Sequence, residues 1–468
     1  MKELTKSTDK LSASFPFLNT WLGYQREHLK VPGLVVAIAK DGDVVFKAAY
    51  GLANLEKKSP IEPDQLFRIA SHSKTFATVA ILQLCDAGKI DLEDHIAKFL
   101  PWLKGHSDQR VANITVRNLL SNSSGLLRDV QDIDYWQMER PFLDESALQE
   151  TVMKAPLFAD PATELKYSNT GFSLVGLIVE KVTGVEFNEY VKEKILEPLG
   201  LKNTGPEYDR AIAKRLVTGY SAADFNDRRI PFGQVDSRAM SAATGFYSCA
   251  DDLLKFFNAL SKNSSLPISP KLKREMQQTH WRSQNITDKR EYGLGLQIEY
   301  GGEKRYFGHG GAFPGQRSFT LCDLERGLVV TALANAIDFE PLPFVKGIYS
   351  VIDFFEADDP PEEKLRQFEG IYRNLWGSTQ LVARGKSLVA INPDTTSPFK
   401  DVENLDYVDK YLLKITKCGG YGNNGEFVRF TFKKDNTVES LTYGGATMLP
   451  RADYLKKYRR TKTIALAK

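Results

Sequence analysis

The chain has 468 residues, of which 42% are hydrophobic and 26% are charged, a composition that is typical of a globular protein and excludes a disordered or fibrous one. This length exceeds what one ordinary hydrophobic core serves, so we expect two or three domains. The 62 Lys and Arg residues against 59 Asp and Glu leave a formal charge of +3, which gives no electrostatic case for nucleic acid as the main partner.

The first 355 residues are expected to carry strands at both ends and helices between them. Two apolar runs flank Asp41-Gly42, which predicts a β-hairpin, and apolar residues recur at helical spacing from Thr75 until Gly88. The other expected elements are helix 17–29, hairpin strands 33–40 and 43–50, helices 116–120, 172–182, 187–196 and 250–260, a loop region through 284, strands 295–300, 304–308, 316–322 and 328–334, and helix 343–355. This order predicts an α/β (α+β) fold with one antiparallel sheet assembled from both ends, helices packed on it and an all-helical middle.

A second, smaller domain is expected at the C-terminus. Residues 356–363 are acidic and contain prolines, as expected of a linker. Short alternating segments follow at 380–382, 388–391, 411–415, 427–432 and 440–443, separated by Gly, Asn and Asp turns. This texture predicts a small all-β domain. The predicted limits are 1–357 for the first domain, 358–365 for the linker, 366–456 for the all-β domain and 457–468 for a basic tail.

The segment from Arg128 to Pro161 is rich in charged and aromatic residues. One interpretation is a lid or loop that faces a substrate. The alternative is a pair of packed surface helices whose aromatic side chains point inward.

Neither a membrane span nor a secretory signal is recognisable. No apolar run reaches the roughly 18–20 residues that a span requires, and residues 1–17 hold scattered lysines but no continuous apolar stretch. The four cysteines lie far apart, which favours reduced thiols over a disulfide framework or a zinc site. We therefore expect a cytoplasmic protein without metal or cofactor, or a periplasmic or secreted one if a signal was trimmed.

Ser71 and Lys74 are the first candidates for chemistry, because they lie one helical turn apart where a helix is expected to begin. Unpaired backbone N–H groups at a helix N-terminus favour developing negative charge, and Lys74 adds an amine that can take the serine proton. The alternative is that Ser71 merely caps the helix and Lys74 is solvated. The same spacing recurs at 7–10 and 397–400, in surroundings that do not suit catalysis.

Tyr167 and His309 are the next candidates. Tyr167 precedes Asn169 at the entry to a predicted helix, and a phenol held near a lysine ammonium is expected to lose its proton below its usual pKa of about 10. His309 precedes Gly310 and Gly311 at the end of a predicted strand, where glycines let a substrate backbone approach. His309 can donate a hydrogen bond to a substrate carboxylate or to Tyr167. The alternatives are an ordinary half-buried tyrosine and a structural histidine.

Taken in chain order, Ser71-x-x-Lys74, Tyr167-Ser168-Asn169 and His309-Gly310-Gly311 resemble the motifs of the penicillin-recognising serine hydrolases, in the form shared by class C β-lactamases, D-Ala-D-Ala carboxypeptidases, D-aminopeptidases and related esterases. The resemblance covers residues 15–355. Further segments that resemble the family are Phe67-Arg68-Ile69-Ala70, Asn118-Leu119-Leu120-Ser121 with Ser124-Gly125-Leu126, Pro198-Leu199-Gly200-Leu201, and Tyr292-Gly293-Leu294-Gly295-Leu296. The resemblance implies a β-lactamase/transpeptidase-like fold for residues 1–357.

The resemblance also implies a role for each motif residue. Ser71 would be the acylated nucleophile, with Lys74 and Tyr167 as the acid/base pair. The backbone N–H groups of Ser71 and Ala312 would form the oxyanion hole. The remaining roles are a fourth catalytic residue, His309, and the substrate-binding residues Asn169, Gly310 and Gly311.

The chain departs from the family pattern at three positions. His309 stands where the family's β-lactamases usually carry the lysine of Lys-Thr-Gly, whereas His-x-Gly resembles the peptidase and aminopeptidase members. Asn122 and His72 also differ from the commonest family residues. The resemblance thus implies a serine hydrolase that cleaves small peptides or amides, including peptides with D-residues. A carboxylesterase, a β-lactamase and a catalytically silent scaffold of the same fold are the alternatives.

The C-terminal domain resembles the lipocalin-like β-barrel that follows the catalytic domain in some of these peptidases. In such relatives a barrel can restrict access to the cleft or serve oligomerisation. The expected partners are therefore a small peptide, amide or ester substrate and further copies of the chain.

Overall fold

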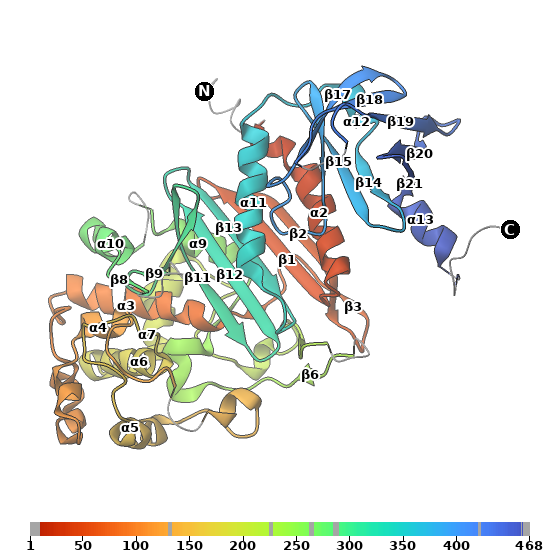
Figure 1. The fold of residues 1–468 in the computed structure, drawn as a ribbon. Helices are drawn as coiled ribbons and strands as arrows, with labels where there is room; N and C mark the ends of the chain where they lie inside the picture. Colours follow the sequence, from red (N-terminus) through yellow and green to blue (C-terminus); the bar gives the residue numbers. More distant parts are fainter. Residues whose placement is uncertain are drawn as a thin grey trace. The chain divides into compact units, whose positions relative to one another are not determined.

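The computed structural model describes residues 10–129, 133–223, 228–261, 266–283, 290–419, 423–459 and 461. The chain divides into two compact units: one is residues 30–345, and the other combines the described parts of 1–29 and 346–468 (Figure 1). The predicted domain limits of 1–357, 358–365, 366–456 and 457–468 divide the chain differently at residues 1–29 and 346–357, and they remain a prediction.

An antiparallel sheet forms the centre of the larger unit, and its strand order among the described residues is β3-β2-β1-β13-β12-β11-β10-β9-β8. Strand β1 pairs with β13 from Leu34↔Ala334 to Lys40↔Leu328, so the two ends of this unit meet in the middle of the sheet, as predicted. The strands are β1 (Gly33–Lys40), β2 (Asp43–Asn54), β3 (Ser59–Pro60), β8 (Trp281–Arg282), β9 (Glu291–Tyr292), β10 (Gln297–Gly301), β11 (Lys304–Phe313), β12 (Gln316–Asp323) and β13 (Leu328–Ala334).

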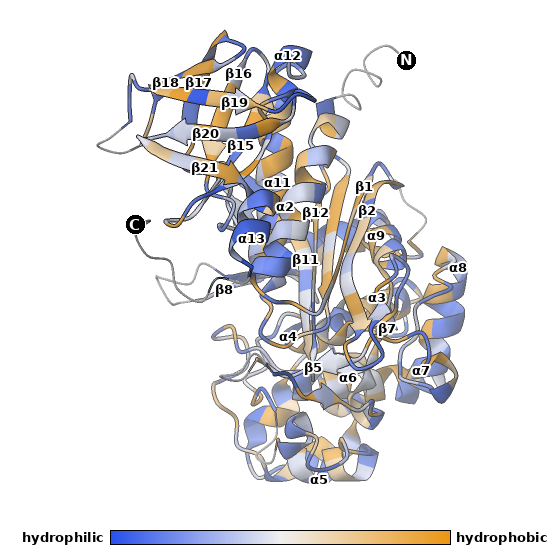
Figure 2. Ribbon diagram, turned by 90° about the vertical axis from the view of Figure 1, so that its right-hand side faces the viewer, coloured by the Kyte–Doolittle hydropathy of each residue, from blue (hydrophilic) through white to orange (hydrophobic). Residues whose placement is uncertain are grey.

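Helices and short turns from the middle of the chain surround this sheet. Helix α9 packs on β1, β12 and β13, and α3 packs against α6. The α-helices are α3 (Ser73–Asp86), α4 (Val116–Leu120), α5 (Glu145–Lys154), α6 (Asn169–Thr183), α7 (Phe187–Val191), α8 (Glu197–Leu199), α9 (Ala250–Asn258) and α10 (Pro270–Gln277). The other elements used below are the 3-10 helices η1 (Ala70–His72), η5 (Asp134–Gln137) and η8 (Arg238–Met240), the π-helices η6 (Lys192–Leu196) and η9 (Ser241–Gly245), and the strand pair β4 (Phe67–Arg68) and β7 (Tyr247–Ser248). Figure 2 shows hydrophobic residues concentrated on the sheet and the helices beside it.

Three local predictions needed correction. The predicted helix 187–196 is interrupted, because its second half is the π-helix η6. The loop expected through 284 contains α10, which begins where Ser269 Oγ accepts from Leu272 N and Pro270 occupies the first turn, a start signal that the sequence did carry. Strand β11 does not stop at Gly308 but continues to Phe313, because pairing with β12 outweighs the low strand propensity of its glycines.

A closed barrel of β14 to β21 forms most of the smaller unit among the residues that the structure describes. Its strands are β14 (Gly370–Arg373), β15 (Ser378–Arg384), β16 (Ser387–Ile391), β17 (Glu403–Asp409), β18 (Leu412–Lys417), β19 (Phe427–Phe432), β20 (Val438–Tyr443) and β21 (Ala446–Pro450). Strands β14, β17 and β21 were not predicted, since polar residues and a glycine obscure their alternation. Buried side chains such as Phe368, Leu405 and Ile415 cluster in one core of this unit.

Four helices accompany or adjoin the barrel: α2 (Phe15–His28), α11 (Pro341–Glu356), α12 (Glu363–Arg366) and α13 (Arg451–Tyr458). Helix α12 lies at the end of the predicted linker, and the hydrophilic α13 runs into the predicted basic tail (Figure 2). The rest of that tail, apart from residues 459 and 461, lies outside the described residues. None of the described helices is long and apolar enough to cross a membrane.

Candidate active site

Ser71 lies in η1, the 3-10 turn between β4 and α3. Its side chain caps neither helix, since α3 begins at Ser73 and no side chain caps it. Ala70 has a φ of 45°, a left-handed conformation that costs a residue with a Cβ about 1–3 kcal/mol. The turn is held through Ser73, whose Oγ donates to Ala70 O at 2.5 Å and accepts from Phe246 N at 3.1 Å. The helix-cap interpretation of Ser71 is therefore wrong.

Lys74 is fully buried, and its Nζ lies within hydrogen-bond distance of three oxygens. Asn169 Oδ1 and Ala243 O, both at 2.7 Å, can only accept, so they take two N–H groups of the amine. The third oxygen is Ser71 Oγ at 3.1 Å. Burial lowers the pKa of Lys74 well below its usual value, although Asp129 opposes this shift. In the neutral amine the remaining position is a lone pair aimed at Ser71, which can accept the serine proton.

Asp129 fixes the orientation of Asn169. Asn169 Nδ2 donates to Asp129 Oδ1 at 2.9 Å and to Oδ2 at 3.1 Å, which turns the amide oxygen toward Lys74. Tyr135 Oη and Trp136 Nε1 also donate to Asp129 Oδ1, each at 3.2 Å. Both ends of the Asn169 amide are thus engaged inside the protein. The geometry makes Asn169 a support of Lys74, and the implied contact with a substrate amide stays a prediction.

Tyr167 is half-buried beside Lys74 and Arg128. Lys74 Nζ lies 4.8 Å and Arg128 Cζ 5.8 Å from the centroid of its ring, and its hydroxyl forms a hydrogen bond with Ser71. Burial raises the pKa of Tyr167 above its usual value, although the bond to Ser71 and the Arg128 charge oppose the shift. The expectation that Lys74 lowers this pKa is therefore wrong: Tyr167 keeps its proton and can act as an acid.

His309 is fully buried in β11 and bonded through both ring nitrogens. Nδ1 lies 2.7 Å from Gly310 O, which can only accept, so this nitrogen carries the proton. Nε2 then accepts from Tyr292 Oη at 2.9 Å. Burial lowers the pKa of His309 well below its usual value, so the ring is neutral. The sequence suggested that His309 donates to a substrate carboxylate or to Tyr167. In this arrangement neither ring nitrogen is left to do so.

The glycines after His309 are required by the protein's own packing. A Cβ on Gly310 would lie 2.6 Å from the Phe319 ring, and one on Gly311 would lie 2.0 Å from Ile69 O. Strand β11 therefore lies closer to the turn that contains Ser71 than a side chain at Gly311 would permit. This steric reason is independent of the predicted approach of a substrate backbone.

Strand β11 leaves one edge unpaired where Ala312 lies. The pairing with β10 ends at Gln297↔Gly308, whereas the pairing with β12 continues to Phe313↔Gln316. Gly310 N donates to Gln297 Oε1 at 3.0 Å, so its N–H points to the β10 side. Because N–H directions alternate along a strand, Ala312 N–H points to the same side, beyond the end of β10. This direction is consistent with the predicted oxyanion-hole role of Ala312, which remains a prediction.

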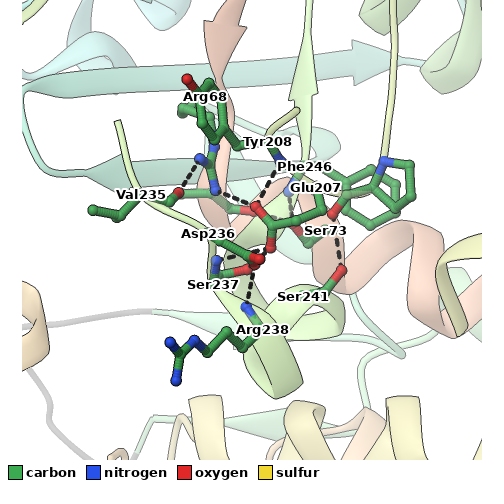
Figure 3. A network of polar contacts seen from close by, with 12 residues as sticks. Arg68, Ser73, Glu207, Tyr208, Val235, Asp236, Ser237, Arg238, Ser241 and Phe246 are labelled. Carbon is green, nitrogen blue, oxygen red and sulfur yellow. Dashed lines mark hydrogen bonds and ion pairs between the residues drawn. The ribbon is translucent and has the colours of Figure 1, made fainter. Parts of the chain in front are cut away.

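A second polar network, centred on Glu207, lies beside the nucleophile turn (Figure 3). The buried Arg68 guanidinium pairs with Glu207 Oε1 at 3.0 Å, donates to Val235 O at 2.6 Å and lies 4.0 Å from the centroid of the Phe313 ring. Glu207 Oε2 accepts from the N–H of Ser237 at 2.9 Å and from the Ser237 hydroxyl. The carboxylate thereby connects β4 with the segment that leads into η8 and η9.

The aromatic segment after Arg128 packs inward, as the second interpretation predicted. Tyr135 in η5 and Phe142 are 1% and 2% exposed and form one cluster with Ala70 and Phe313. Residues 130–132 lie outside the described part of the segment. The segment thus supports the site through Asp129 and through this aromatic cluster.

Four residues that contact the candidate site residues or Arg68 were not predicted from the sequence: Asp129, Glu207, Ala243 and Tyr292. Tyr292 did stand in a family-like segment, and Asp129 begins the aromatic-rich segment, so both carried a local signal. Glu207 and the Ala243 carbonyl carried none, because only the fold brings Glu207 to Arg68 and Ala243 to Lys74. Among the described residues no group of three or more His, Cys, Asp or Glu side chains could hold a metal ion.

Comparison with known proteins shows which family the chain belongs to. A curated relative, Protein flp of Staphylococcus aureus (strain MW2), is 29% identical over 203 residues, which are 43% of this chain and 40% of the relative. The chain therefore matches less than half the length of this relative.

Two solved structures share the fold. The octameric penicillin-binding protein homologue from Pyrococcus abyssi has a TM-score of 0.64 and 24% identity, covering 93% of this chain and 99% of the other. A D-stereospecific amidohydrolase from Streptomyces sp. has a TM-score of 0.60 and 26% identity, covering 70% and 94%. The family model named Beta-lactamase matches residues 20–343, which include every motif residue above. The chain therefore belongs to the beta-lactamase family of serine hydrolases.

Proposed function

We propose that this protein forms an acyl-enzyme on Ser71 and cleaves amide bonds in small peptides. The observation that carries the proposal is the position of Lys74 Nζ, 3.1 Å from Ser71 Oγ with two of its N–H groups committed to Asn169 and Ala243. Burial lowers the pKa of this amine and so favours its neutral form, which would be a general base already aligned with its nucleophile.

The proposed acylation uses each group once. Ser71 Oγ attacks the substrate carbonyl carbon while its proton passes to Lys74 Nζ. The negative oxygen of the tetrahedral intermediate is held by the backbone N–H groups of Ser71 and Ala312, where the loss of one donor typically costs about 3–4 kcal/mol. As the C–N bond breaks, Tyr167 Oη gives its proton to the leaving amine and is reprotonated from Lys74. Water then releases the acyl group by the reverse proton route.

Amides are favoured over esters because of the state of Tyr167. An amine leaves only when it is protonated, so an amide substrate needs an acid at the leaving-group side. Tyr167 retains its proton because burial raises its pKa, and it is hydrogen-bonded to the nucleophile. The D-stereospecific amidohydrolase among the structural relatives supports the same bond type, including substrates with D-residues.

The experiment is active-site labelling followed by a substrate comparison. We expect a fluorophosphonate probe to add one adduct to the intact protein, and Ser71→Ala to abolish it. Ser397→Ala is the matched control, since residues 397–400 repeat the Ser-x-x-Lys spacing outside this site and the change should leave labelling intact. No labelling of the wild type would favour the silent scaffold.

Substrate class is decided with paired compounds of the same acyl group. Chromogenic amides of L-Ala and D-Ala and the corresponding esters are compared by kcat/KM. Cleavage of the amides supports the proposal, whereas rapid ester turnover with no amide cleavage would make the protein a carboxylesterase. Turnover of a β-lactam alone would make it a β-lactamase.

We also propose that the protein assembles with further copies of itself, because the Pyrococcus abyssi homologue of nearly the same length is octameric. Light scattering coupled to size-exclusion chromatography measures the assembly. A mass of one chain across micromolar concentrations would contradict it.

A further inference from the structure

Glu207 is a largely buried carboxylate, with 12% of its side chain exposed, that the proposed chemistry does not use. It lies between Pro206 and Tyr208, far from the motifs in sequence, and accepts from Tyr208 N at 2.6 Å. Its other bonds reach Arg68 on one side and Ser237 on the other, so one side chain joins segments that are about 140 and 30 residues away. A carboxylate with this many donors is well suited to fix backbone segments relative to each other.

The Arg68 side of this connection leads to the nucleophile. Arg68 lies in β4, three residues before Ser71, and its backbone N–H donates to Gln316 Oε1 at 2.7 Å. Its guanidinium also covers the ring of Phe313, the residue after Ala312. Contacts that fix the position of Arg68 therefore also fix the turn that contains Ser71 and the C-terminal end of β11.

The Ser237 side leads to the base. Ser237 precedes η8 and η9, and η9 contains Ala243, whose carbonyl accepts from Lys74 at 2.7 Å. The segment passes very close to Glu207: a Cβ on Gly245 would lie 2.7 Å from Glu207 Oε2 and 2.6 Å from Pro206 O. Ser241 Oγ donates to Pro206 O at 2.8 Å, which adds a second tie to the same segment (Figure 3).

We propose that Glu207 is a positioning residue for the hydrolytic site, whose ionised carboxylate holds Ser71 through Arg68 and Lys74 through the Ala243 carbonyl. The inference rests on the proposed function of Ser71 and Lys74. Protonation of Glu207 weakens the pair with Arg68 and the bonds from Ser237, so η9 and the nucleophile turn lose their common anchor. A displacement of about 1 Å at a site of this kind costs up to about 100-fold in rate.

Burial places the titration of Glu207 near neutral pH. Burial raises the pKa of Glu207 to about 7, against the opposing effects of Arg68, Ser237 and the Tyr208 N–H, while Asp236 adds to the increase. The charged or titratable groups that face it are thus Arg68, Tyr208 and Asp236. Since the ionised form is the productive one, the rate rises as pH passes through this pKa, in addition to the rise that Lys74 causes.

The test is the pH dependence of fluorophosphonate labelling of Ser71 in the wild type and in Glu207→Gln. We expect the variant to label about 10- to 100-fold more slowly above pH 8 and to approach the wild-type rate below pH 6, because it resembles the protonated state at every pH. The wild-type profile should contain a step near pH 7 that the variant lacks.

The control is Asp252→Asn, which alters a buried carboxylate with a raised pKa that lies in α9 and accepts from Asn203 N and Thr204 Oγ1. This control should keep the step near pH 7 even if it lowers stability. The inference is overturned if the labelling rate of Glu207→Gln shows a step near pH 7 as large as that of the wild type. It is also overturned if the variant is slower than the wild type by the same factor at every pH. If the wild type is not labelled at Ser71 at any pH, the proposed function fails instead, and this inference fails with it.

Discussion

Asp129 offers the sharpest test of how the base is held. Its carboxylate receives both bonds from Asn169 Nδ2 and one each from Tyr135 and Trp136, all between 2.9 and 3.2 Å. In Asp129→Ala the Asn169 amide and the Trp136 indole lose this acceptor, each at a cost of about 1–3 kcal/mol. We therefore expect a loss of at least about 2 kcal/mol in the free energy of unfolding, measured by urea denaturation.

Asp129→Asn separates the charge from the geometry. Its Oδ1 can still accept from Asn169, Tyr135 and Trp136, but its new NH2 group faces the Asn169 Nδ2 donor and the negative charge is gone. Because the Asp129 charge raises the pKa of Lys74, its removal lowers that pKa further. The acid limb of kcat/KM should move to lower pH, and the plateau should fall, since a base of lower pKa takes a proton less readily.

The assay is the pH profile of kcat/KM on a chromogenic ester, with Asp134→Asn as the matched control. Asp134 is an exposed carboxylate of the same segment that pairs with Arg140 at 3.3 Å, and its change should leave the limb in place. A limb that stays fixed in Asp129→Asn, or that moves to higher pH, would refute the proposed support of Lys74.

The remaining predictions concern the acid, the third motif and the close approach of β11. Tyr167→Phe should slow amide cleavage by about 10²–10⁴-fold but fluorophosphonate labelling far less, because only the amine must be protonated to leave; equal losses would contradict this role. Tyr292→Phe removes the donor to His309 Nε2, so that buried nitrogen loses its partner and the unfolding free energy should fall by about 1–3 kcal/mol, as urea denaturation can show. Gly311→Ala places a Cβ 2.0 Å from a backbone carbonyl and should lower the melting temperature in calorimetry, whereas Gly233→Ala, with nothing within 4 Å, should not.

Much of the fold follows from local patterns. Strand β1 is buried along nearly its whole length, and its apolar run with Asp41-Gly42 behind it can form little else than the first strand of a hairpin. Thr115 and Asn118 form the reciprocal bonds of a capping box, so α4 has the limits that its sequence predicts. The elements that were missed, such as β14 and β17, have mixed polar sequences and are stabilised as strands by their neighbours in the closed barrel.

Some features of the candidate site could likewise be predicted from the sequence, and others could not. Ser71, Lys74, Tyr167 and His309 could be named as candidates from the sequence, because the three short motifs that hold them together resemble those of the penicillin-recognising serine hydrolases. Their protonation states could not be found, since a pKa depends on burial and on neighbours from distant segments. The sequence led us to expect that a Lys74 ammonium would lower the pKa of Tyr167, and burial instead lowers the pKa of Lys74 and raises that of Tyr167.

The sequence by itself determined which residues could carry the chemistry and the order of their motifs along the chain. Only the tertiary structure decided how they act together, because the partners that orient them come from far along the chain. Asp129 turns Asn169, Ala243 holds Lys74, Tyr292 donates to Nε2 of His309, and Glu207 joins the strand before Ser71 to the segment that carries Ala243. None of these contacts has a fixed spacing in sequence, and each depends on a hydrogen bond that is stronger inside the folded protein than in water.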